Sequence, residues 1–443
     1  MNRQLPQMLV IDDSQSNLRY DLQSVLILVS STGLVFTACG ISFAFGVYQE
    51  LYDSMSSIPN TPFTGATPAQ IDLIGTLAIA LMTIGAPFTT TWIKQYSPRR
   101  VVWSGGLIYS VALLLASFSY TLWQFLLTQG FLLGIGTCMA YMPSVTVGPT
   151  WFSLHRGLAM GIILSGTGIG GVIWPLAFRS LIARIGFRNT LRATSGISFI
   201  LISIFGAFIR WPASQMSRIQ AENRAILLSP NMFRIPLVDW RVARTRRFIA
   251  HALGAALQSA AYYTPIFFFA SYARTLGYSQ ATSANFIAIS NAASVPSRII
   301  IGHAADRMGR LNTMLLTTLL SAVAVLGIWF PSSNSSQESG GKSLFIAFTI
   351  CYGVFASAYI SLFPTTLVET FGIQNFASVN GVLYMVRGFA MLLGTPVAGL
   401  LIRSSNYQKP DPRNYGNTSI MVGALFSAAT IAVFWARLEG SLS

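Results

Sequence analysis

Gly166, Gly168 and Gly171 have the G-x-G-x-x-G spacing that cradles dinucleotide phosphates in some enzymes. That chemistry requires a strand before the glycines, a helix after them and an acidic residue about 20 positions further on. Here the glycines lie inside a long apolar stretch, and no acidic residue occurs between Asp72 and Glu222. The sequence therefore does not predict a nucleotide site. It also lacks the G-x-x-x-x-G-K-[ST] loop that would indicate an ATP-driven pump.

The same stretch fits close helix packing. Two pairs of glycines are each four residues apart, so each pair lies on one helix face, and small residues at that spacing let helices approach closely in lipid. The four glycines are Gly157, Gly161, Gly166 and Gly170. The preceding apolar segment has its own small-residue surface, formed by Gly130, Gly134 and Gly136. We expect these glycines to hold the fourth and fifth helices together.

Two arginines stand inside apolar segments, where a charge costs about 2.5–3.5 kcal/mol and usually faces a cavity or a partner. Arg298 and Arg387 are therefore candidates for binding an anion, although a structural pair or a side chain reaching the membrane surface would also explain them. Polar residues in neighbouring segments are further substrate-binding candidates: Gln129, Tyr141, Gln258, Tyr262, Tyr263 and Tyr359. Each of these also suits an internal hydrogen bond.

The composition indicates a protein that is embedded in a lipid bilayer. Of the 443 residues, 53% are hydrophobic and 9% are charged, whereas soluble proteins carry about 25% charged residues. The net charge of +15 comes from basic residues that punctuate apolar runs, so we expect no nucleic-acid partner. Three distant cysteines and three scattered histidines predict no metal or cofactor site. No paired carboxylates or nucleophile–base set indicates an enzyme.

Apolar segments of about 20 residues, each long enough to cross a bilayer, can be counted from the gaps between charges. They predict an all-α membrane protein with twelve transmembrane helices in two six-helix halves, at 22–209 and 248–436. Between the halves, the loop 210–247 contains eight arginines, which places it in the cytoplasm by the positive-inside rule. The tails 1–21 and 437–443 should then be cytoplasmic too. The glycosylation sequons at Asn334 and Asn417 fall on the predicted outer side.

The stretch "GHAADRMGR", which begins at Gly302, follows the eighth span and matches G-x-x-x-D-R-x-G-R. It resembles the loop signature of the major facilitator superfamily, whose fold has two six-helix halves. The resemblance assigns a conformational role to Gly302, Asp306, Arg307, Gly309 and Arg310. Asp306 can face the positive end of a neighbouring helix. The equivalent loop of the first half ends in "PRR", but Thr90 and Lys94 replace its Gly and Asp.

A longer segment, Leu126–Pro175, is similar to spans 4 and 5 of fungal monocarboxylate-porter-like transporters. The resemblance implies a secondary transporter that moves a small organic molecule by alternating access, and places Arg298 at the family's span 8 arginine. Ser294 replaces an Asp that animal members carry, and no lysine occurs between Arg19 and Lys94, where lactate carriers have one. The resemblance to this family therefore does not by itself imply proton-coupled uptake of monocarboxylates.

We expect the substrate to be an organic anion. Export of a hydrophobic secondary metabolite is the alternative, and a non-transporting nutrient sensor is an alternative of another class. Glu50 and Glu369, at the ends of spans, are candidates for carrying a coupled proton. The expected partners are the lipid bilayer and the small-molecule substrate, and the expected location is the plasma membrane.

Overall fold

The computed structural model describes residues 22–227, 238–335, 338–403 and 411–441. All regular secondary structure in these ranges is helical. The predicted tail 1–21, the end of the tail 437–443 and part of the central loop lie outside the described residues.

The first half begins with α1 and α2, which form one bent span. Its elements are α1 (Leu22–Phe43), α2 (Phe45–Ser56), α3 (Pro68–Ile84), α4 (Ala86–Tyr96), α5 (Pro98–Ser117), α6 (Leu122–Phe125), the π-helical η2 (Leu126–Leu132), α7 (Leu133–Trp151) and α8 (Arg156–Gly206). The pair α3 and α4 bends by 48°. Pro87, at the start of α4, has no N–H for the preceding turn, which explains the bend.

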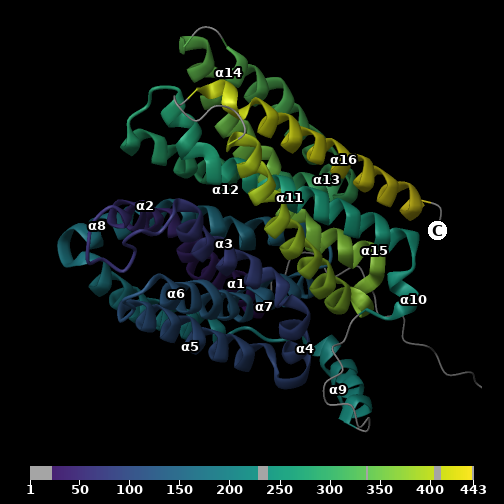
Figure 1. Ribbon diagram of the computed structural model, residues 1–443. Helices are drawn as coiled ribbons and strands as arrows, with labels where there is room; N and C mark the ends of the chain where they lie inside the picture. The colour runs from purple at the N-terminus through teal and green to yellow at the C-terminus, as the bar shows by residue number, and fades with distance from the viewer. Residues whose placement is uncertain (1–21, 228–237, 336–337, 404–410, 442–443) are drawn as a thin grey trace, which may run out of the picture.

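The central loop contains α9 (Ala213–Leu227) and α10 (Trp240–Ala243). The second half contains α11 (Arg246–Thr275), α12 (Gln280–Met308), α13 (Arg310–Ala324), the π-helical η3 (Val325–Trp329), α14 (Phe330–Asn334), α15 (Glu338–Arg403), the 3₁₀ turn η4 (Pro412–Tyr415) and α16 (Gly416–Ser441). In Figure 1 the two halves form separate groups of helices, and α9 projects beyond them.

The helices give twelve crossings, as the sequence predicts. Seven helical stretches of the described residues are long and apolar enough to span a membrane, and the bent pair α3–α4 makes an eighth. Two of them cross twice, because Gly186 and Gly372, at φ 76° and 72°, interrupt α8 and α15 and the chain turns back. The 30-residue α11 and the 29-residue α12 complete the set.

The reversal at Gly186 corrects the predicted boundaries. The apolar runs Gly157–Phe178 and Ala193–Ile209 predict spans 5 and 6, with a loop between them that contains Arg179, Arg184, Arg188 and Arg192. The structure instead continues both helices to a single non-helical residue. Aromatic rings and oxygen acceptors bind the side chains of Arg188 and Arg192 in the helix that follows Gly186. Arg188, for example, donates to the oxygens of Ser117 and Ser119 at 2.7 and 3.0 Å.

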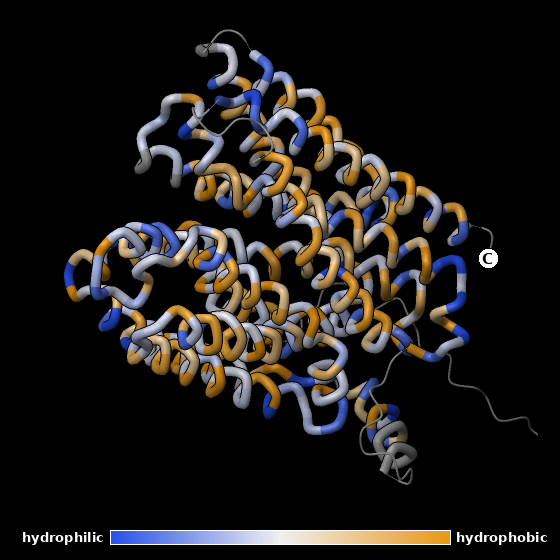
Figure 2. The backbone as a smooth tube through the Cα atoms, in the orientation of Figure 1, coloured by the Kyte–Doolittle hydropathy of each residue, from blue (hydrophilic) through white to orange (hydrophobic). Residues whose placement is uncertain are grey.

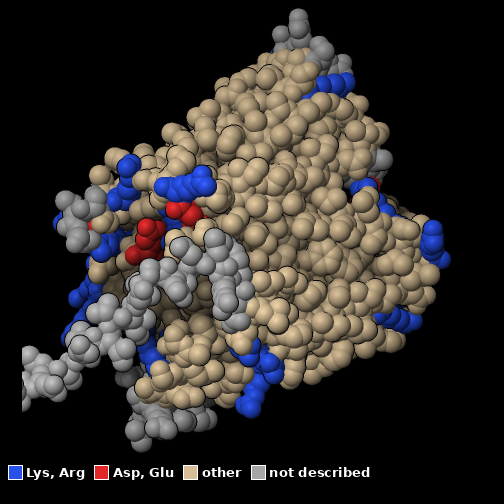
Figure 3. All heavy atoms as spheres, turned by 180° about the vertical axis from the view of Figure 1, so that it is seen from behind, with Lys and Arg blue, Asp and Glu red and all other residues tan. Residues whose placement is uncertain are grey.

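The surface has the distribution of polarity that a bilayer requires. Hydrophobic residues follow the middle of the helices, and hydrophilic residues gather at their ends and in the connections (Figure 2). Lys and Arg side chains lie towards the two ends of the molecule with a wide uncharged band between them (Figure 3). Exposed side chains such as Leu393, at 70%, and Ile431, at 71%, lie on helices that cross this band.

The ends of the helices define two sides of the molecule. The side with residues 207–227 and 238–245, here called the central-loop side, also has the α4–α5 and α12–α13 turns and the end of α16 (Figure 1). The exposed Asn334 and Asn417 lie on the opposite side, together with Gly186. Which side faces the cytoplasm, and whether the two asparagines are glycosylated, stay predictions.

The glycines of α8 do pack against other helices, but the predicted partner was wrong. A Cβ at Gly166 would lie 2.5 Å from the main-chain oxygen of Thr32 in α1, and one at Gly157 would lie 2.5 Å from that of Gly302 in α12. Gly170 meets Gly40 of α1, and Gly161 meets the Arg298 oxygen of α12.

The G-x-G-x-x-G stretch therefore presents two faces: Gly166 towards α1, and Gly168 and Gly171 towards Ser294 and Asn291 of α12. The small residues of span 4 instead contact other helices. Gly130 and Gly134 meet α3, and Gly136 meets Tyr109 of α5. Glycine spacing thus indicated which faces are close, and the tertiary structure decided which helix each face meets.

Candidate functional site

Arg387 lies at the interface of the two halves, inside a cage of aromatic rings. Its guanidinium carbon is 5.1 Å from the ring centre of Tyr384, 5.2 Å from that of Phe363 and 6.0 Å from that of Tyr359. The residue is 3% exposed. The aromatic faces stabilise the buried cation, with contributions that increase when water is excluded.

The cage leaves most of the polar capacity of Arg387 unused. Nε and Nη1, which carry three of the five guanidinium N–H groups, have no hydrogen-bond partner among the described residues. Gln258, which is fully buried on α11, has no partner for either side-chain polar atom in the part of the chain that the structure describes. Buried polar groups without partners cost about 1–3 kcal/mol each, and more when charged. These groups are therefore suited to bind a ligand that brings its own acceptors.

The elements around Arg387 explain its position. The Ser259 hydroxyl of α11 donates to the main-chain oxygen of Arg387 at 2.9 Å, which fixes α15 against α11. Tyr384, three residues before Arg387, shares its helix face, and its hydroxyl is 3.2 Å from that of Tyr141 on α7. The contact joins the first half to the second. We call Tyr141, Tyr263, Tyr359, Phe363, Tyr384 and Arg387 the Arg387 cluster, and Gln258 directly precedes Ser259 on α11.

Arg298 has a different environment, although it is equally buried, at 3% exposure. Its Nη1 donates to the main-chain oxygen of Leu164 and to the Thr167 hydroxyl, both on α8. These contacts hold α12 to α8 across the interface, so part of the guanidinium is already occupied by protein. The sequence favoured Arg298 over Arg387 as the anion contact. The geometry favours Arg387, because among the described residues Arg298 lacks a partner only at Nε, whereas Arg387 lacks one at both Nε and Nη1.

The remaining predicted residues divide into two groups. Tyr262 and Tyr263 lie at the central interface. The ring centre of Tyr263 is 6.5 Å from that of Phe43 on α1, and the main-chain oxygen of Tyr262 accepts from the Tyr352 hydroxyl at 2.6 Å. Gln129 lies apart from them, inside the first half, and accepts from the Tyr52 hydroxyl at 2.9 Å. Its environment is that of a core residue.

Sequence reasoning missed Tyr384 and Phe363. Tyr384 had a signal, since it precedes Arg387 by three residues and therefore lies on the same helix face. Phe363 lies 24 residues earlier, before the break at Gly372, and only the reversal of the chain at that glycine brings it to Arg387.

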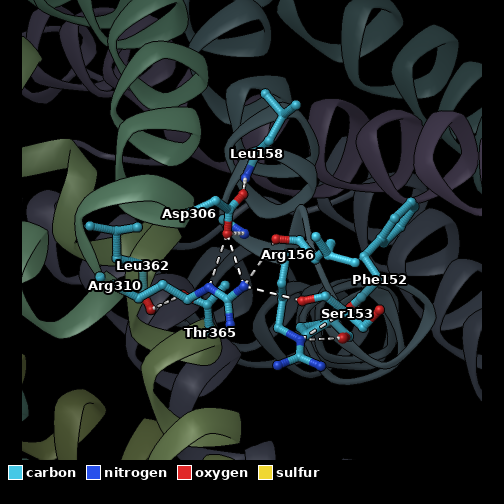
Figure 4. A network of polar contacts seen from close by, with 12 residues as sticks. Phe152, Ser153, Arg156, Leu158, Asp306, Arg310, Leu362 and Thr365 are labelled. Carbon is cyan, nitrogen blue, oxygen red and sulfur yellow. Dashed lines mark hydrogen bonds and ion pairs between the residues drawn. The ribbon is translucent and has the colours of Figure 1, made fainter. Parts of the chain in front are cut away.

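A second site closes the central-loop side (Figure 4). The two carboxylate oxygens of Asp306, on α12, accept from the main-chain N–H groups of Gly157 and Leu158 at 2.8 and 2.9 Å. These N–H groups belong to the first turn of α8, whose N–H groups have no partner within their own helix and carry its positive dipole end. The expected position of Asp306 at a neighbouring helix end is therefore confirmed.

Arg310 completes this contact, which we call the Asp306 latch. Its Nε donates to Asp306 Oδ1 at 3.0 Å, and its Nη2 donates to the main-chain oxygen of Ser153 at 3.2 Å. The side chains of Arg310 and Asp306 are only 13% and 5% exposed. Gly302 and Gly157 let the two backbones meet here, and Gly309 turns the chain at φ 91°. Arg307 points to solvent.

Comparison with known proteins gives the same architecture. The sequence profile of the Major Facilitator Superfamily matches residues 25–395 and 272–441. The solved proton:xylose symporter XylE has a TM-score of 0.69 at 10% identity, over 92% of this chain and 94% of that one. This likeness supports the twelve-helix fold.

Three curated fungal relatives extend the match along the chain. An MFS-type transporter of Gibberella moniliformis is 27% identical over 90% of this chain and 88% of its own. The agnestins efflux protein AgnL12 of Paecilomyces divaricatus is 28% identical over 94% and 88%. The probable transporter MCH2 of Saccharomyces cerevisiae is 26% identical over 91% and 80%. With two buried interface arginines and a charged latch on a twelve-helix scaffold, the chain belongs to the Major Facilitator Superfamily and is a transporter related to its fungal members.

Proposed function

We propose that the protein is a secondary active transporter of an organic anion with a substantial apolar or aromatic body, and that the Arg387 cluster binds it. The proposal depends mainly on the buried guanidinium of Arg387, which lies inside a cage of aromatic rings and whose Nε and Nη1 have no partner among the described residues. A carboxylate or phenolate would receive the free N–H groups, while the apolar body of the substrate would pack against the rings. In this fold, substrate sites lie between the two halves.

A neutral hydrophobic metabolite is the second candidate, favoured by the same aromatic side chains. The relative named as an efflux protein supports export as the direction. The two substrate classes differ in their dependence on charge, because a neutral molecule gains little from a guanidinium that aromatic rings already stabilise.

We propose a cytoplasmic central-loop side with both termini on it, and the plasma membrane as the location. If a proton is coupled, its carrier lies outside the Arg387 cluster, since the cluster's ionisable groups are one arginine and four tyrosines. Glu50 lies on α2, and Glu369 lies within electrostatic reach of Arg156 near the latch.

The test begins with metabolite profiling of cells with and without the protein, followed by transport of the identified compound in proteoliposomes. Arg387→Lys keeps the charge but loses the forked donor geometry, and Arg387→Gln loses the charge. For an anion we expect Arg387→Gln to weaken apparent affinity by about thirtyfold or more, in line with truncation of a buried charge contact. Arg387→Lys should fall between Arg387→Gln and the wild type.

The matched control is Arg437→Gln, which removes an exposed arginine of α16 that belongs neither to the Arg387 cluster nor to the Asp306 latch. Tyr359→Phe keeps the ring over Arg387 and removes only a hydroxyl, so it should retain most of the affinity. Equal affinity for an anionic substrate in Arg387→Gln and wild type, at equal protein abundance, would exclude Arg387 from the site. Transport of neutral compounds alone would favour the second candidate.

A further inference from the structure

The side-chain amide of Gln258 is a buried polar group whose hydrogen-bonding capacity is unmet. The residue is 0% exposed, and neither Oε1 nor Nε2 has a hydrogen-bond partner among the described residues. Two other buried amides do have partners. Gln129 Oε1 accepts from the Tyr52 hydroxyl at 2.9 Å, and Asn380 Nδ2 donates to the Thr146 hydroxyl at 3.4 Å. Because most buried polar side chains in folded proteins are paired, an amide that is unpaired at both ends indicates a position that a ligand completes.

The position of Gln258 follows from the register of α11 against the segment of α15 before its break. One turn after Gln258, the Tyr262 ring stacks on that of Tyr352, with 6.2 Å between the ring centres. One turn before it, a Cβ at Gly254 would lie 3.7 Å from the Tyr359 hydroxyl. Residues four apart share a helix face. Gln258 therefore lies on the face of α11 that runs along Tyr352 and Tyr359.

The residue of α15 at the level of Gln258 explains why the amide is unpaired. By this register it is Ala356, which is about one turn from both Tyr352 and Tyr359 and is 1% exposed. Its side chain ends at Cβ and has no polar atom. The helix that packs against Gln258 thus offers no side-chain hydrogen bond at this level.

The same helices place Gln258 beside the Arg387 cluster. The next residue, Ser259, donates from its hydroxyl to the main-chain oxygen of Arg387 at 2.9 Å. The ring centre of Tyr359 is 6.0 Å from the guanidinium carbon. Tyr262, one turn further on, is within electrostatic reach of Arg387. The amide and the guanidinium therefore belong to one buried region, and each has polar atoms without partners among the described residues.

The two groups require different partners. The guanidinium of Arg387 only donates hydrogen bonds, so a carboxylate satisfies it. The amide of Gln258 donates from Nε2 but accepts at Oε1, and a carboxylate has no proton to give to Oε1. A hydroxyl supplies that donor, while its oxygen or the carboxylate accepts from Nε2. An organic acid without a hydroxyl therefore leaves Oε1 unpaired, and a hydroxylated acid does not.

We propose that the substrate is a hydroxylated organic acid whose hydroxyl is selected by Gln258, which rests on the proposed binding of the acid group by the Arg387 cluster. The acid group pairs with Arg387, the hydroxyl pairs with the Gln258 amide, and the apolar body packs against the aromatic rings. Selection of this kind acts mainly by rejection. An analogue that lacks the hydroxyl leaves a buried polar group unpaired in the complex, which lowers its affinity.

The preference for a hydroxyl can be measured on the purified protein with matched organic acids. The probes are 3-phenylpropionate, its three ring-hydroxylated isomers and 3-phenyllactate. They share the charge and the aromatic body, and differ in whether and where a hydroxyl stands. We expect at least one hydroxylated acid to bind about tenfold or more tightly than 3-phenylpropionate. Titration calorimetry gives the affinities, and the rise in unfolding temperature checks them.

Gln258→Met separates recognition from a structural role. The variant keeps the length of the side chain and removes the unpaired polar atoms, so the ligand-free protein should unfold at a higher temperature. The preference for the hydroxyl should disappear, while binding of 3-phenylpropionate is kept. The matched control is Gln129→Met, which leaves the Tyr52 hydroxyl without its acceptor. It should lower the unfolding temperature and keep the preference.

Arg387→Gln distinguishes failure of this proposal from failure of the proposed function, because it should weaken all five acids and keep the preference. The role of Gln258 is overturned, and the anion site stands, if Arg387→Gln weakens the acids but the wild type shows no preference or Gln258→Met retains it. A lower unfolding temperature or loss of folding in Gln258→Met also overturns that role. Unchanged binding of the acids in Arg387→Gln overturns the anion site itself, and absence of binding by all five acids overturns both proposals.

Discussion

Replacement of Asp306 by Asn tests whether the latch stabilises one conformational state. The substitution keeps the size of the side chain and one acceptor, but removes the charge that faces Arg310 and the first N–H groups of α8. One of the N–H groups of Gly157 or Leu158 must then face an amide NH₂ instead of an oxygen.

The expected magnitude follows from the burial of this contact. Asp306 and Arg310 are 5% and 13% exposed, so solvent does little to replace the lost charge. Hydrogen bonds to charged groups contribute about 1.5–3 kcal/mol each, and removal of one partner from a buried pair costs about 3–5 kcal/mol. Taking about 3 kcal/mol, the ratio of the closed to the open central-loop side should fall by about a hundredfold, since each 1.4 kcal/mol is a factor of ten.

The assay follows labelling of Thr146→Cys by a soluble thiol reagent, with the three native cysteines replaced, in the wild-type and Asp306→Asn backgrounds. Thr146 on α7 is fully buried and accepts from the Asn380 side chain of α15 at 3.4 Å, so its labelling reports separation of the halves. We expect faster labelling, slower transport and protein abundance near normal, with Asp306→Ala more severe because both acceptors are lost. Asp239→Asn is the matched control, since Asp239 caps the short α10 through the Arg241 N–H and lies away from the α8–α12 contact. Wild-type labelling and wild-type transport in Asp306→Asn would refute the latch role.

Three further predictions follow from the described contacts. Gly161→Leu should abolish folding, because its side chain would enter the main chain of α12, whereas Gly196→Leu, at an open position, should be tolerated; membrane-inserted abundance measures both. Arg298→Gln should reduce thermal stability more than substrate affinity, because it releases the contacts with α8; unfolding temperature and transport kinetics on the same samples separate the two effects. Single cysteines at Ser217 and Ser335 should differ in intact cells, with an impermeant reagent labelling only Ser335→Cys; the reverse pattern would invert the proposed topology.

The architecture could be predicted because it depends on long-range regularities of composition. Charge-free stretches of about 20 residues give the spans, and the motif at Gly302 gives the family. The ends of the spans were harder. Arg188 and Arg192 read as a loop, yet they lie in a helix, because Arg188 stacks 4.5 Å over Tyr120 and Arg192 4.7 Å over Phe118. Cation–π contacts of this kind depend on neighbours that are distant in sequence.

The site was harder to predict for the same reason. Glycine spacing identified close faces on α8 but not their partners in α1 and α12. Arg298 and Arg387 look alike in sequence because each is a single charge in an apolar span. The structure distinguishes them by the contacts of Arg298 with Leu164 and Thr167 and by the aromatic rings around Arg387. Gln129 was polar and central in its span, but its partner Tyr52 lies 77 residues earlier.

The single-residue reversal at Gly186 links the interface to the surrounding lipid. Consecutive Cα atoms are only 3.8 Å apart, so a one-residue connection cannot absorb a large displacement of one segment past the other. The segment before Gly186 contacts α1 and α12, while the segment after it exposes Ile200 and Ile204 at 57% and 53%. Each cycle of opening must therefore move a lipid-facing surface. A bilayer whose hydrocarbon thickness matches this surface in one conformation of the transporter will stabilise that conformation. Membrane thickness therefore affects the balance between the open and closed states.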